Sequence, residues 1–308
     1  RRQRQMCIRD RAFMMLVMIF IILPRAIVSA RRINEVLSTN PKILNGTVTE
    51  TAESDKGTIE FKNVSFKYPD ASDYVLRDIS FKAEKGKTIA FIGATGSGKS
   101  TLINLIPRFY DATDGDVLVD GVNVKEYDIE SLNNKLGYVP QKAVMFSGTV
   151  SSNVAYGNNG RDNYSADDIK QAIKIAQGTE FVEKMENQYE GAIAQGGSNI
   201  SGGQKQRLAI ARAVCRKPEI YIFDDSFSAL DYKTDRVLRS ELKKETAGTT
   251  TLIVAQRIGT IKDADCIIVL DKGNMVGKGT HSELMKNCEV YQQIALSQLS
   301  KEELGNDE

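Results

Sequence analysis

The sequence predicts an α/β fold around a largely parallel sheet, and two observations support this prediction. From Thr58 onward, short apolar or β-branched runs alternate with stretches of helical periodicity, which is the pattern of strands joined by crossover helices. A glycine-rich turn, Gly93–Ser100, joins one such strand, Thr88–Ile92, to the helical run Thr101–Ile106. Three more runs are expected to be strands of the same domain, namely Glu219–Phe223, Thr250–Ala255 and Cys266–Leu270.

The composition is that of an ordinary globular protein. The 308 residues are 41% hydrophobic and 26% charged, which suits one large domain or two modest ones. The net charge of +1 speaks against a nucleic-acid-binding surface. The cysteines stand without metal-ligand or paired spacing, which indicates reduced thiols. The single histidine, His281, cannot build a histidine metal site, and its setting predicts the first turn of a helix.

The N-terminal segment changes character twice. Residues 1–11 are polar and basic, Ala12–Leu23 are apolar without interruption, and Pro24 follows. Because a membrane-spanning helix needs about 20 apolar residues, the run is either a buried core helix or the cytoplasmic end of a membrane helix whose beginning is missing. The arginines that follow favour the second interpretation. We therefore expect residues 12–44 to be the end of a membrane helix with its cytoplasmic extension, and residues 1–11 to be foreign to the native chain.

Composition also divides the rest of the chain. Residues 45–57 are polar with few apolar side chains, which predicts a linker. Residues 58–300 hold the alternating pattern and form the predicted globular domain. Residues 301–308 are expected to be an acidic tail.

The segment Gly93–Ser100 matches the phosphate-loop pattern G-x-x-x-x-G-K-[ST] in full and stands in the required strand–helix context. Its glycines let backbone N–H groups turn inward on phosphates, and the start of the following helix adds a favourable dipole. We expect Lys99 to reach the β- and γ-phosphates of a nucleotide and the Ser100 hydroxyl to ligate Mg²⁺. The predicted nucleotide contacts are Gly93, Ala94, Thr95, Gly96, Ser97, Gly98, Lys99, Ser100 and Thr101.

Two carboxylates follow a second apolar strand. The run Ile220–Phe223 ends at Asp224, which we expect to hold Mg²⁺ largely through water. Asp225 follows directly, at the place where a general base for an attacking water would sit.

A helix with an unusual beginning precedes these carboxylates. The segment Ser201-Gly202-Gly203-Gln204 opens a helical run that Pro218 ends, and Ser201 fits the N-cap position. Glycines in a first helical turn are unfavourable for a helix. We therefore expect this backbone to approach a ligand, and an anion suits a helix N-terminus.

These elements, in this order, resemble the ATP-binding-cassette (ABC) family. Ser201–Gln204 is similar to the family signature, and the resemblance extends from Ala12 to about Gln298. The stretch Leu23–Leu37 resembles the exit of the last membrane helix of exporters.

The resemblance also implies roles for residues outside these motifs. Tyr68 resembles the aromatic residue that stacks on adenine, and Gln141 resembles the Q-loop glutamine that contacts Mg²⁺ and faces the membrane domain. A further segment resembles the D-loop, which crosses to a second cassette, and consists of Ser228, Ala229, Leu230 and Asp231.

For the whole chain, the resemblance implies a P-loop NTPase cassette with a mostly parallel sheet core, an antiparallel β subdomain and a helical subdomain at about residues 142–217. It implies ATP and Mg²⁺ as cofactors and the chain's own membrane domain as a partner. The cassette would lie on the cytoplasmic side of the inner or plasma membrane. In this family two cassettes pair head to tail, with ATP between the phosphate loop of one and the signature of the other.

Two catalytic positions depart from the family pattern. Asp225 stands where the family usually has glutamate, and the shorter carboxylate retreats by more than about 1 Å, which can cost roughly a hundredfold in rate. Gln256 stands where exporters usually have a switch histidine, and glutamine cannot become cationic or shuttle a proton. Ile193–Gly197 also departs from the usual G-E-R-G form. Together these features resemble the degenerate half of a heterodimeric exporter, in which Asp225, Gln256 and Gln141 would form a weak catalytic group.

The expected function is therefore that of a cassette that binds ATP and hydrolyses it poorly, while its signature completes the site of a partner that carries glutamate and histidine. Two other functions stay open. One is a homodimeric, fully hydrolysing exporter ATPase. The other is a soluble ABC ATPase of DNA repair or translation, against which the apolar run and the near-zero net charge speak.

Overall fold

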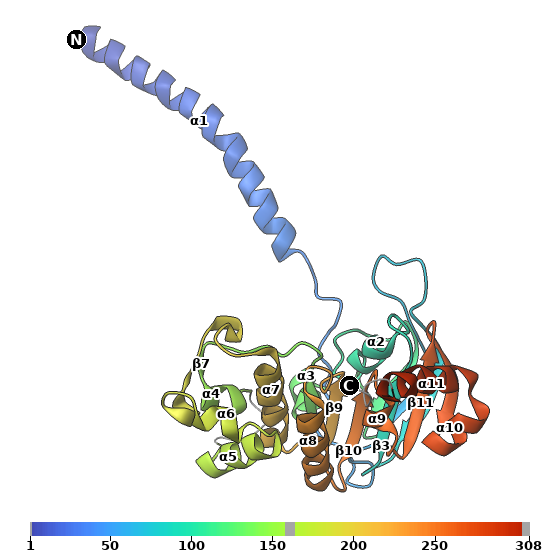
Figure 1. Cartoon of the computed structure of the whole chain (residues 1–308). Coiled ribbons are helices and arrows are strands. Elements are labelled where there is room, and N and C mark those ends of the chain that lie inside the picture. Colours follow the sequence, from blue (N-terminus) through green and yellow to red (C-terminus); the bar gives the residue numbers. More distant parts are fainter. Residues whose placement is uncertain (1, 158–163, 304–308) are drawn as a thin grey trace. The chain divides into compact units, whose positions relative to one another are not determined.

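The structure is a computed structural model that describes residues 2–157 and 164–303 (Figure 1). The chain divides into two compact units, residues 1–44 and residues 45–308. Most of the predicted acidic tail, residues 304–308, lies outside the described residues.

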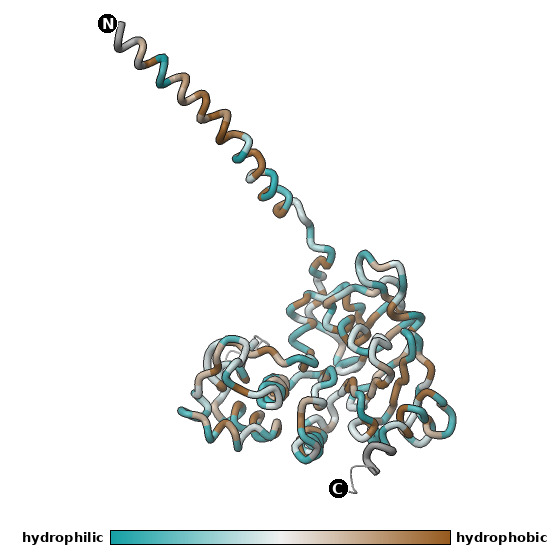
Figure 2. Tube along the Cα trace, turned by 45° about the horizontal axis from the view of Figure 1, so that its top comes forward, coloured by the Kyte–Doolittle hydropathy of each residue, from teal (hydrophilic) through white to brown (hydrophobic). Residues whose placement is uncertain are grey.

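The first unit contains a single long helix, α1 (Arg2–Leu37), which continues through Pro24. Its apolar side chains are exposed, with Phe13 at 69% and Phe20 at 71% of full exposure. The stretch Ile8–Leu37 is long and apolar enough to cross a membrane, and Figure 2 shows its hydrophobic band. The interpretation as a buried core helix is therefore wrong for the described structure, whereas the end of a membrane helix fits.

The second unit is built on a six-stranded sheet in the order β12-β11-β3-β10-β9-β6. Neighbouring strands are parallel except for the β11–β12 pair. The central strands are buried along almost their whole length, as expected for a parallel sheet covered on both faces. The mostly parallel core is thus confirmed. The strands are β3 (Thr88–Ile92), β6 (Leu136–Val139), β9 (Ile220–Asp224), β10 (Thr250–Val254), β11 (Cys266–Asp271) and β12 (Asn274–Gly279).

A second sheet is antiparallel and has the strand order β2-β1-β4-β5. Its buried side chains belong to the same core as those of β3 and β9. The rings of Phe61 and Phe81, for example, stack across β1 and β2 with centroids 4.6 Å apart. This sheet is the expected antiparallel subdomain. Its strands are β1 (Ile59–Phe66), β2 (Leu76–Ala83), β4 (Asp114–Val119) and β5 (Val122–Asn123).

A helical subdomain packs around a separate core at one end of the main sheet, away from α10 and α11 (Figure 1). Apolar residues at helical spacing, such as Ile169 and Ile173, face this core. Its helices are α4 (Val150–Val154), α5 (Ala166–Ile175), α6 (Thr179–Glu183) and α7 (Gly202–Arg216), with 3₁₀ turns η1 (Gln188–Glu190) and η2 (Gln195–Gly197) and the strand pair β7 (Gly148–Thr149) and β8 (Ala192–Ile193).

The remaining helices connect strands of the two sheets or form the C-terminal region. His281 is the first residue of α10, after the N-cap Thr280, in agreement with the sequence prediction. The helices are α2 (Lys99–Asn104), α3 (Ile129–Asn134), α8 (Tyr232–Glu245), α9 (Ile258–Ile261), α10 (His281–Asn287) and α11 (Glu289–Glu303).

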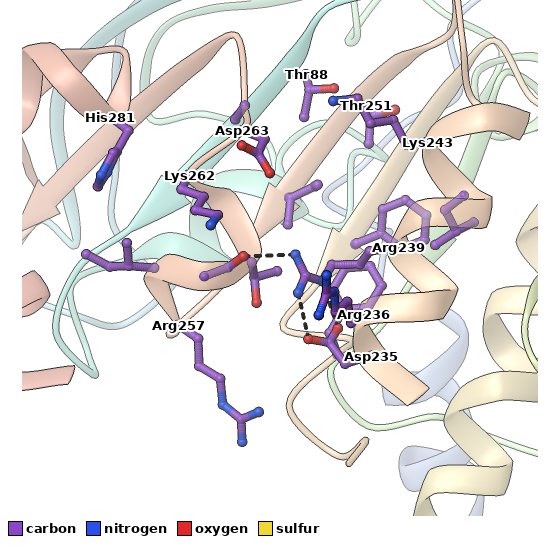
Figure 3. Close-up of a pocket in the computed structure, with 18 of the residues that line it drawn as sticks. Thr88, Asp235, Arg236, Arg239, Lys243, Thr251, Arg257, Lys262, Asp263 and His281 are labelled. Carbon is purple, nitrogen blue, oxygen red and sulfur yellow. Dashed lines mark hydrogen bonds and ion pairs between the residues drawn. The ribbon is translucent and has the colours of Figure 1, made fainter. Parts of the chain in front are cut away.

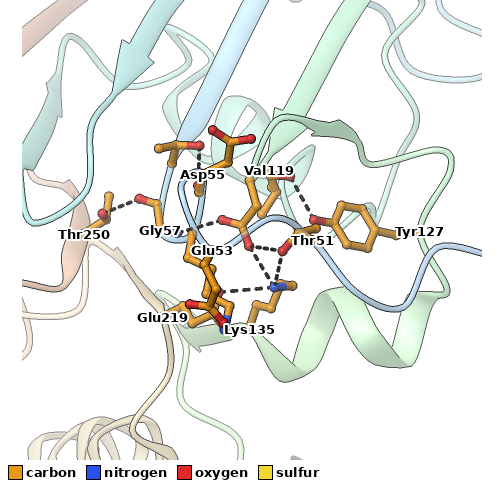
Figure 4. Close-up of polar contacts among 12 residues, drawn as sticks. Thr51, Glu53, Asp55, Gly57, Val119, Tyr127, Lys135, Glu219 and Thr250 are labelled. Carbon is orange, nitrogen blue, oxygen red and sulfur yellow. Dashed lines mark hydrogen bonds and ion pairs between the residues drawn. The ribbon is translucent and has the colours of Figure 1, made fainter.

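The polar segment 45–57, predicted to be a linker, is hydrogen-bonded to the cassette (Figure 4). The backbone N–H of Gly57 donates to Asp120 Oδ1 at 2.7 Å. Lys135 Nζ lies 2.8 Å from Asp120 Oδ2, 3.1 Å from Thr51 Oγ1 and 3.2 Å from Glu219 Oε2. The Asp120 side chain is fully buried, so that Lys135 supplies its counter-charge. We call Asp120, Lys135, Glu219, Thr51 and Gly57 the segment clasp.

Candidate nucleotide-binding and catalytic site

The phosphate loop connects the buried strand β3 to α2, and neighbouring strands fix its path. Gly98 is the N-cap of α2 with φ 97°, and a Cβ there would lie 2.8 Å from Leu76 Cδ2. A Cβ at Gly93 would lie 2.1 Å from the carbonyl oxygen of Leu270. Only glycine fits these two places. The conformation of the loop therefore depends on its glycines and on packing against β2 and β11.

Lys99 folds back over this loop. Its Nζ donates to the carbonyl oxygens of Gly93 at 2.8 Å and Ala94 at 2.9 Å, and lies 3.3 Å from Ser97 Oγ. Burial lowers the pKa of Lys99, and the carboxylates of Asp225 and Asp224 act in the opposite direction. An ammonium group already held at the loop is placed to meet phosphate oxygens there.

Ser100 and Asp224 lie together where β9 ends. The Ser100 hydroxyl donates to Asp224 Oδ1 at 2.9 Å. Burial raises the pKa of Asp224, against the effect of this hydrogen bond. Hydroxyl and carboxylate oxygens suit Mg²⁺, which usually keeps waters and substrate phosphates as its remaining ligands. The donor set therefore fits Mg²⁺ that is bound together with a nucleotide.

The side chains of the predicted catalytic group meet at Asp225. Its Oδ2 accepts hydrogen bonds from Gln256 Nε2 at 2.7 Å and from Gln141 Nε2 at 3.2 Å. Burial raises the pKa of Asp225, and the hydrogen bonds oppose this shift. The backbone of Asp225 has φ 44°, in the left-handed region that aspartate tolerates better than most residues. The structure thus brings together side chains that follow β6, β9 and β10.

Tyr68 lies next to the helix that follows the phosphate loop. Its hydroxyl is 2.9 Å from Thr101 Oγ1. Its partly buried ring meets those of Phe66 and Tyr110 edge-on, with centroids 4.9 Å and 5.2 Å away. The ring is thus fixed beside the phosphate loop, and its stacking on adenine stays a prediction.

The signature lies at the start of α7, in the helical subdomain. Ser201 Oγ accepts from Gln204 N at 3.3 Å, and Ser201 N donates to Gln204 Oε1 at 2.8 Å, which makes a capping box. A Cβ at Gly203 would lie 3.3 Å from the carbonyl oxygen of Ala229, whereas one at Gly202 would meet nothing within 4 Å. Within the described residues, no hydrogen bond or ion pair joins the signature to the phosphate loop.

The D-loop follows Asp225 and leads into α8. The Ser228 hydroxyl donates to the carbonyl oxygen of Asp225 at 2.9 Å. Leu230 is buried in the core of the helical subdomain. Asp231 caps α8 by accepting from Thr234 N at 2.9 Å. The D-loop therefore connects the catalytic group with α8 and the signature region.

Two neighbours of the site were not predicted from the sequence. Tyr138 of β6 lies beside Asp224; burial, followed by the charge of this carboxylate, raises the pKa of the Tyr138 phenol. Its hydroxyl donates to Asn104 Oδ1 of α2 at 2.9 Å. Neither residue belongs to a motif: the pairing of β6 with β9 places Tyr138 here, and Asn104 lies at the end of the helix that follows the phosphate loop.

Comparisons with known proteins agree with this geometry. The sequence model of the ABC transporter family matches residues 76–228. An ABC transporter ATP-binding protein of Mycobacterium tuberculosis is 45% identical over 295 residues, which are 93% of this chain and 49% of that protein. The ATP-dependent lipid A-core flippase of Haemophilus influenzae is 39% identical over 276 residues, 90% of this chain and 46% of that protein.

A solved structure is also similar. The structure of a bacterial Atm1-family ABC exporter with ATP bound matches with a TM-score of 0.84 and 32% identity, and covers 92% of this chain and 50% of that one. The chain thus spans about half the length of the relatives that it matches.

The sheets, the phosphate loop and these matches define an ABC cassette of the P-loop NTPase class. Through its ATP-binding domain, the chain belongs to the ABC transporter family.

Proposed function

We propose that this chain is the ATP-binding part of an ABC exporter, and that it holds Mg-ATP at its own phosphate loop but hydrolyses it slowly. The observation that supports slow hydrolysis most directly is the pair of glutamines at Asp225. Gln256 and Gln141 both donate to the same carboxylate oxygen, at 2.7 Å and 3.2 Å. The predicted catalytic group therefore consists of one short carboxylate and two amides, and among the described residues no hydrogen bond joins an imidazole to it.

The chemistry of the γ-phosphate explains why such a site is slow. Hydrolysis needs a water in line with the phosphate and a group that accepts its proton. The Asp225 carboxylate stands one methylene further back than a glutamate would, and misplacement by about 1 Å can cost roughly a hundredfold. Gln256 can hydrogen-bond the phosphate but cannot carry a proton. Mg²⁺ held by Ser100 and Asp224 would supply charge neutralisation without correcting either defect.

The signature supports a second role for the same chain. Gly202 faces open space, so that the packing of its own chain does not require a glycine there. The capped N-terminus of α7 offers backbone N–H groups to an anion. We propose that two cassettes pair head to tail and that Ser201–Gln204 completes the ATP site of a partner. The partner would be a second exporter half with glutamate and histidine at the catalytic positions.

We further propose that the chain works at the inner or plasma membrane, with the cassette on its cytoplasmic side. The exposed apolar helix α1 and the similarity to exporters support this location. We propose that the cassette acts together with a membrane domain of its own, which would handle the exported substrate.

One observation favours the alternative of a homodimeric, fully hydrolysing ATPase. Burial raises the pKa of Asp225, and a carboxylate with a raised pKa is a better proton acceptor near neutral pH. If the bound nucleotide moved this carboxylate forward, Asp225 and Gln256 would suffice.

ATP turnover by the purified chain separates the two functions. Wild type should bind ATP tightly and turn over slowly, and the double substitution Asp225→Glu with Gln256→His should raise the rate by roughly a hundredfold, because it restores the reach of the base. Robust wild-type hydrolysis that Asp225→Asn abolishes would contradict the slow-site proposal and support the homodimer.

A further inference from the structure

The C-terminal helix α11 contacts the loop that carries Gln256 through one side chain. Gln298 Nε2 donates to the backbone carbonyl of Gln256 at 2.7 Å, and the backbone N–H of Ile258 donates to Gln298 Oε1 at 2.8 Å. Ile258 is the first residue of α9, and its N–H has no partner within that helix. The N-cap residue Arg257 makes no side-chain cap. The amide of Gln298 therefore takes the place of the missing cap.

The loop that carries Gln256 is not packed against other residues on all sides. Residues 257–260 line a cleft of about 1110 Å³ between α8 and the C-terminal helices, and Gln298 lines it too. On the α8 side, Arg239 donates to the carbonyl oxygen of Gly259 at 2.9 Å, and two bonds of 3.0 Å to Asp235 orient its guanidinium (Figure 3). The loop is thus held by polar contacts from α11 on one side and from α8 on the other.

We propose that Gln298 is a positioning residue for the nucleotide site, which acts by fixing the backbone of residues 256–258. This proposal rests on the proposed role of Gln256 in that site. With the backbone fixed, the Gln256 side chain lies 2.7 Å from Asp225. Without it, the carbonyl of Gln256 and the N–H of Ile258 lose their partners, and the loop is free to move into the cleft. A displacement of α11 would also move the backbone of Gln256, because Gln298 connects the two, and so would alter the nucleotide site.

The first test is single-turnover ATP hydrolysis by the full chain. Gln298→Ala should lower the rate about tenfold, because small misplacements of a catalytic group are costly, while the Kd for ATP stays unchanged. Gln298→Glu keeps the acceptor for Ile258 and loses the donor for Gln256, so its rate should lie in between. In the Gln256→Ala background the substitution at 298 should have no further effect, because two residues that act through one contact are not additive.

Hydrogen exchange gives a readout that does not depend on activity. The Ile258 amide should exchange faster in Gln298→Ala than in wild type, since its described acceptor is gone. Gln293→Ala is the matched control, because Gln293 lies on the same helix, is exposed and bonds only Glu289 among the described contacts. It should change neither the hydrolysis rate nor the exchange.

Two results would overturn the proposal. One is unchanged exchange at Ile258 in Gln298→Ala, and the other is an equal loss of rate with and without the Gln256 side chain. Fast hydrolysis by wild type would instead contradict only the slow-site function, because the ratios between variants would still report on Gln298.

Discussion

Opposing requirements meet at the residue Asp225. Catalysis needs an ionised carboxylate near the γ-phosphate, but burial raises the pKa of Asp225 and so disfavours that ionised form. The amides of Gln256 and Gln141 compensate in part through hydrogen bonds to Oδ2. Asp224 lies next to it, also with a raised pKa. Each of these carboxyl groups therefore ionises at a free-energy cost in the folded chain, and a cation bound between them would reduce this cost.

The buried Asp225 carboxylate leads to a prediction about the stability of the folded chain. A carboxyl group whose pKa is raised by folding stabilises the protein in its protonated form, and this contribution is lost as pH rises through the raised pKa. Because pH 7 lies above the ordinary pKa of an aspartate, Asp225 lowers the stability of the folded chain at that pH. Asp225→Asn keeps an oxygen acceptor for both glutamines and removes the charge. It should raise the melting temperature of the nucleotide-free chain at pH 7 by about 2–4 °C, the response to roughly 1 kcal/mol in a domain of this size.

Substitution of Asp168 should change the melting temperature in the opposite direction, and it serves as the control. The hydrogen bond from Lys217 is the main cause that lowers the pKa of Asp168 to about 2. Asp168→Asn should therefore lower the melting temperature at pH 7, and the difference should shrink as pH falls from about 4 towards 2. Thermal scans at pH 7 compare both variants, and scans between pH 4 and pH 2 follow the difference at Asp168. A lower melting temperature of Asp225→Asn at pH 7 would contradict the account of the buried charge.

At the scale of elements, the segment clasp connects parts that the sequence presents as separate. Lys135 follows α3, Asp120 follows β4 and Glu219 precedes β9, and together they hold Thr51 of the polar segment. Burial is the main cause that raises the pKa of Glu219, and Lys135 opposes it. The polar segment is therefore part of the cassette's folded structure, and only residues before Asn45 belong to the other unit.

Removal of the lysine tests the clasp. Lys135→Met should destabilise the cassette by about 3–5 kcal/mol, because it leaves the buried Asp120 carboxylate without a counter-charge. Lys56→Ala is the control, since Lys56 pairs with Glu53 on the surface and such pairs contribute little. Urea unfolding followed by fluorescence of the tyrosines measures both. If Lys135→Met unfolded at the wild-type urea concentration, the clasp would have no structural role.

The whole molecule shows which features sequence patterns can and cannot reveal. The parallel strands and the phosphate loop were predicted, because apolar runs and the G-x-x-x-x-G-K-S pattern are local. The contacts that assemble the site are not local: Gln141 and Asp225 are 84 residues apart, and Gln256 and Gln298 are 42 apart. Family resemblance placed the first pair near each other. Gln298 and the clasp have no motif, and only the packed fold shows them.

The proposed pairing of two cassettes is tested by complementation between two defective chains. In the Asp225→Glu, Gln256→His background, one chain carries Lys99→Ala, which removes the phosphate-loop ammonium. The other carries Gly202→Asp, which places an anion at the predicted phosphate-facing end of α7 and meets open space in its own chain. Neither chain alone should hydrolyse ATP.

A 1:1 mixture of these chains should recover about a quarter of the parent rate, because half of the random two-fold pairs are mixed and each mixed pair has one complete site. The dependence of the rate on the mixing ratio should peak at equal amounts. A mixture that stays inactive would exclude head-to-tail sites shared between chains. Full activity of the Gly202→Asp chain by itself would show that the signature takes no part in binding the nucleotide of a partner.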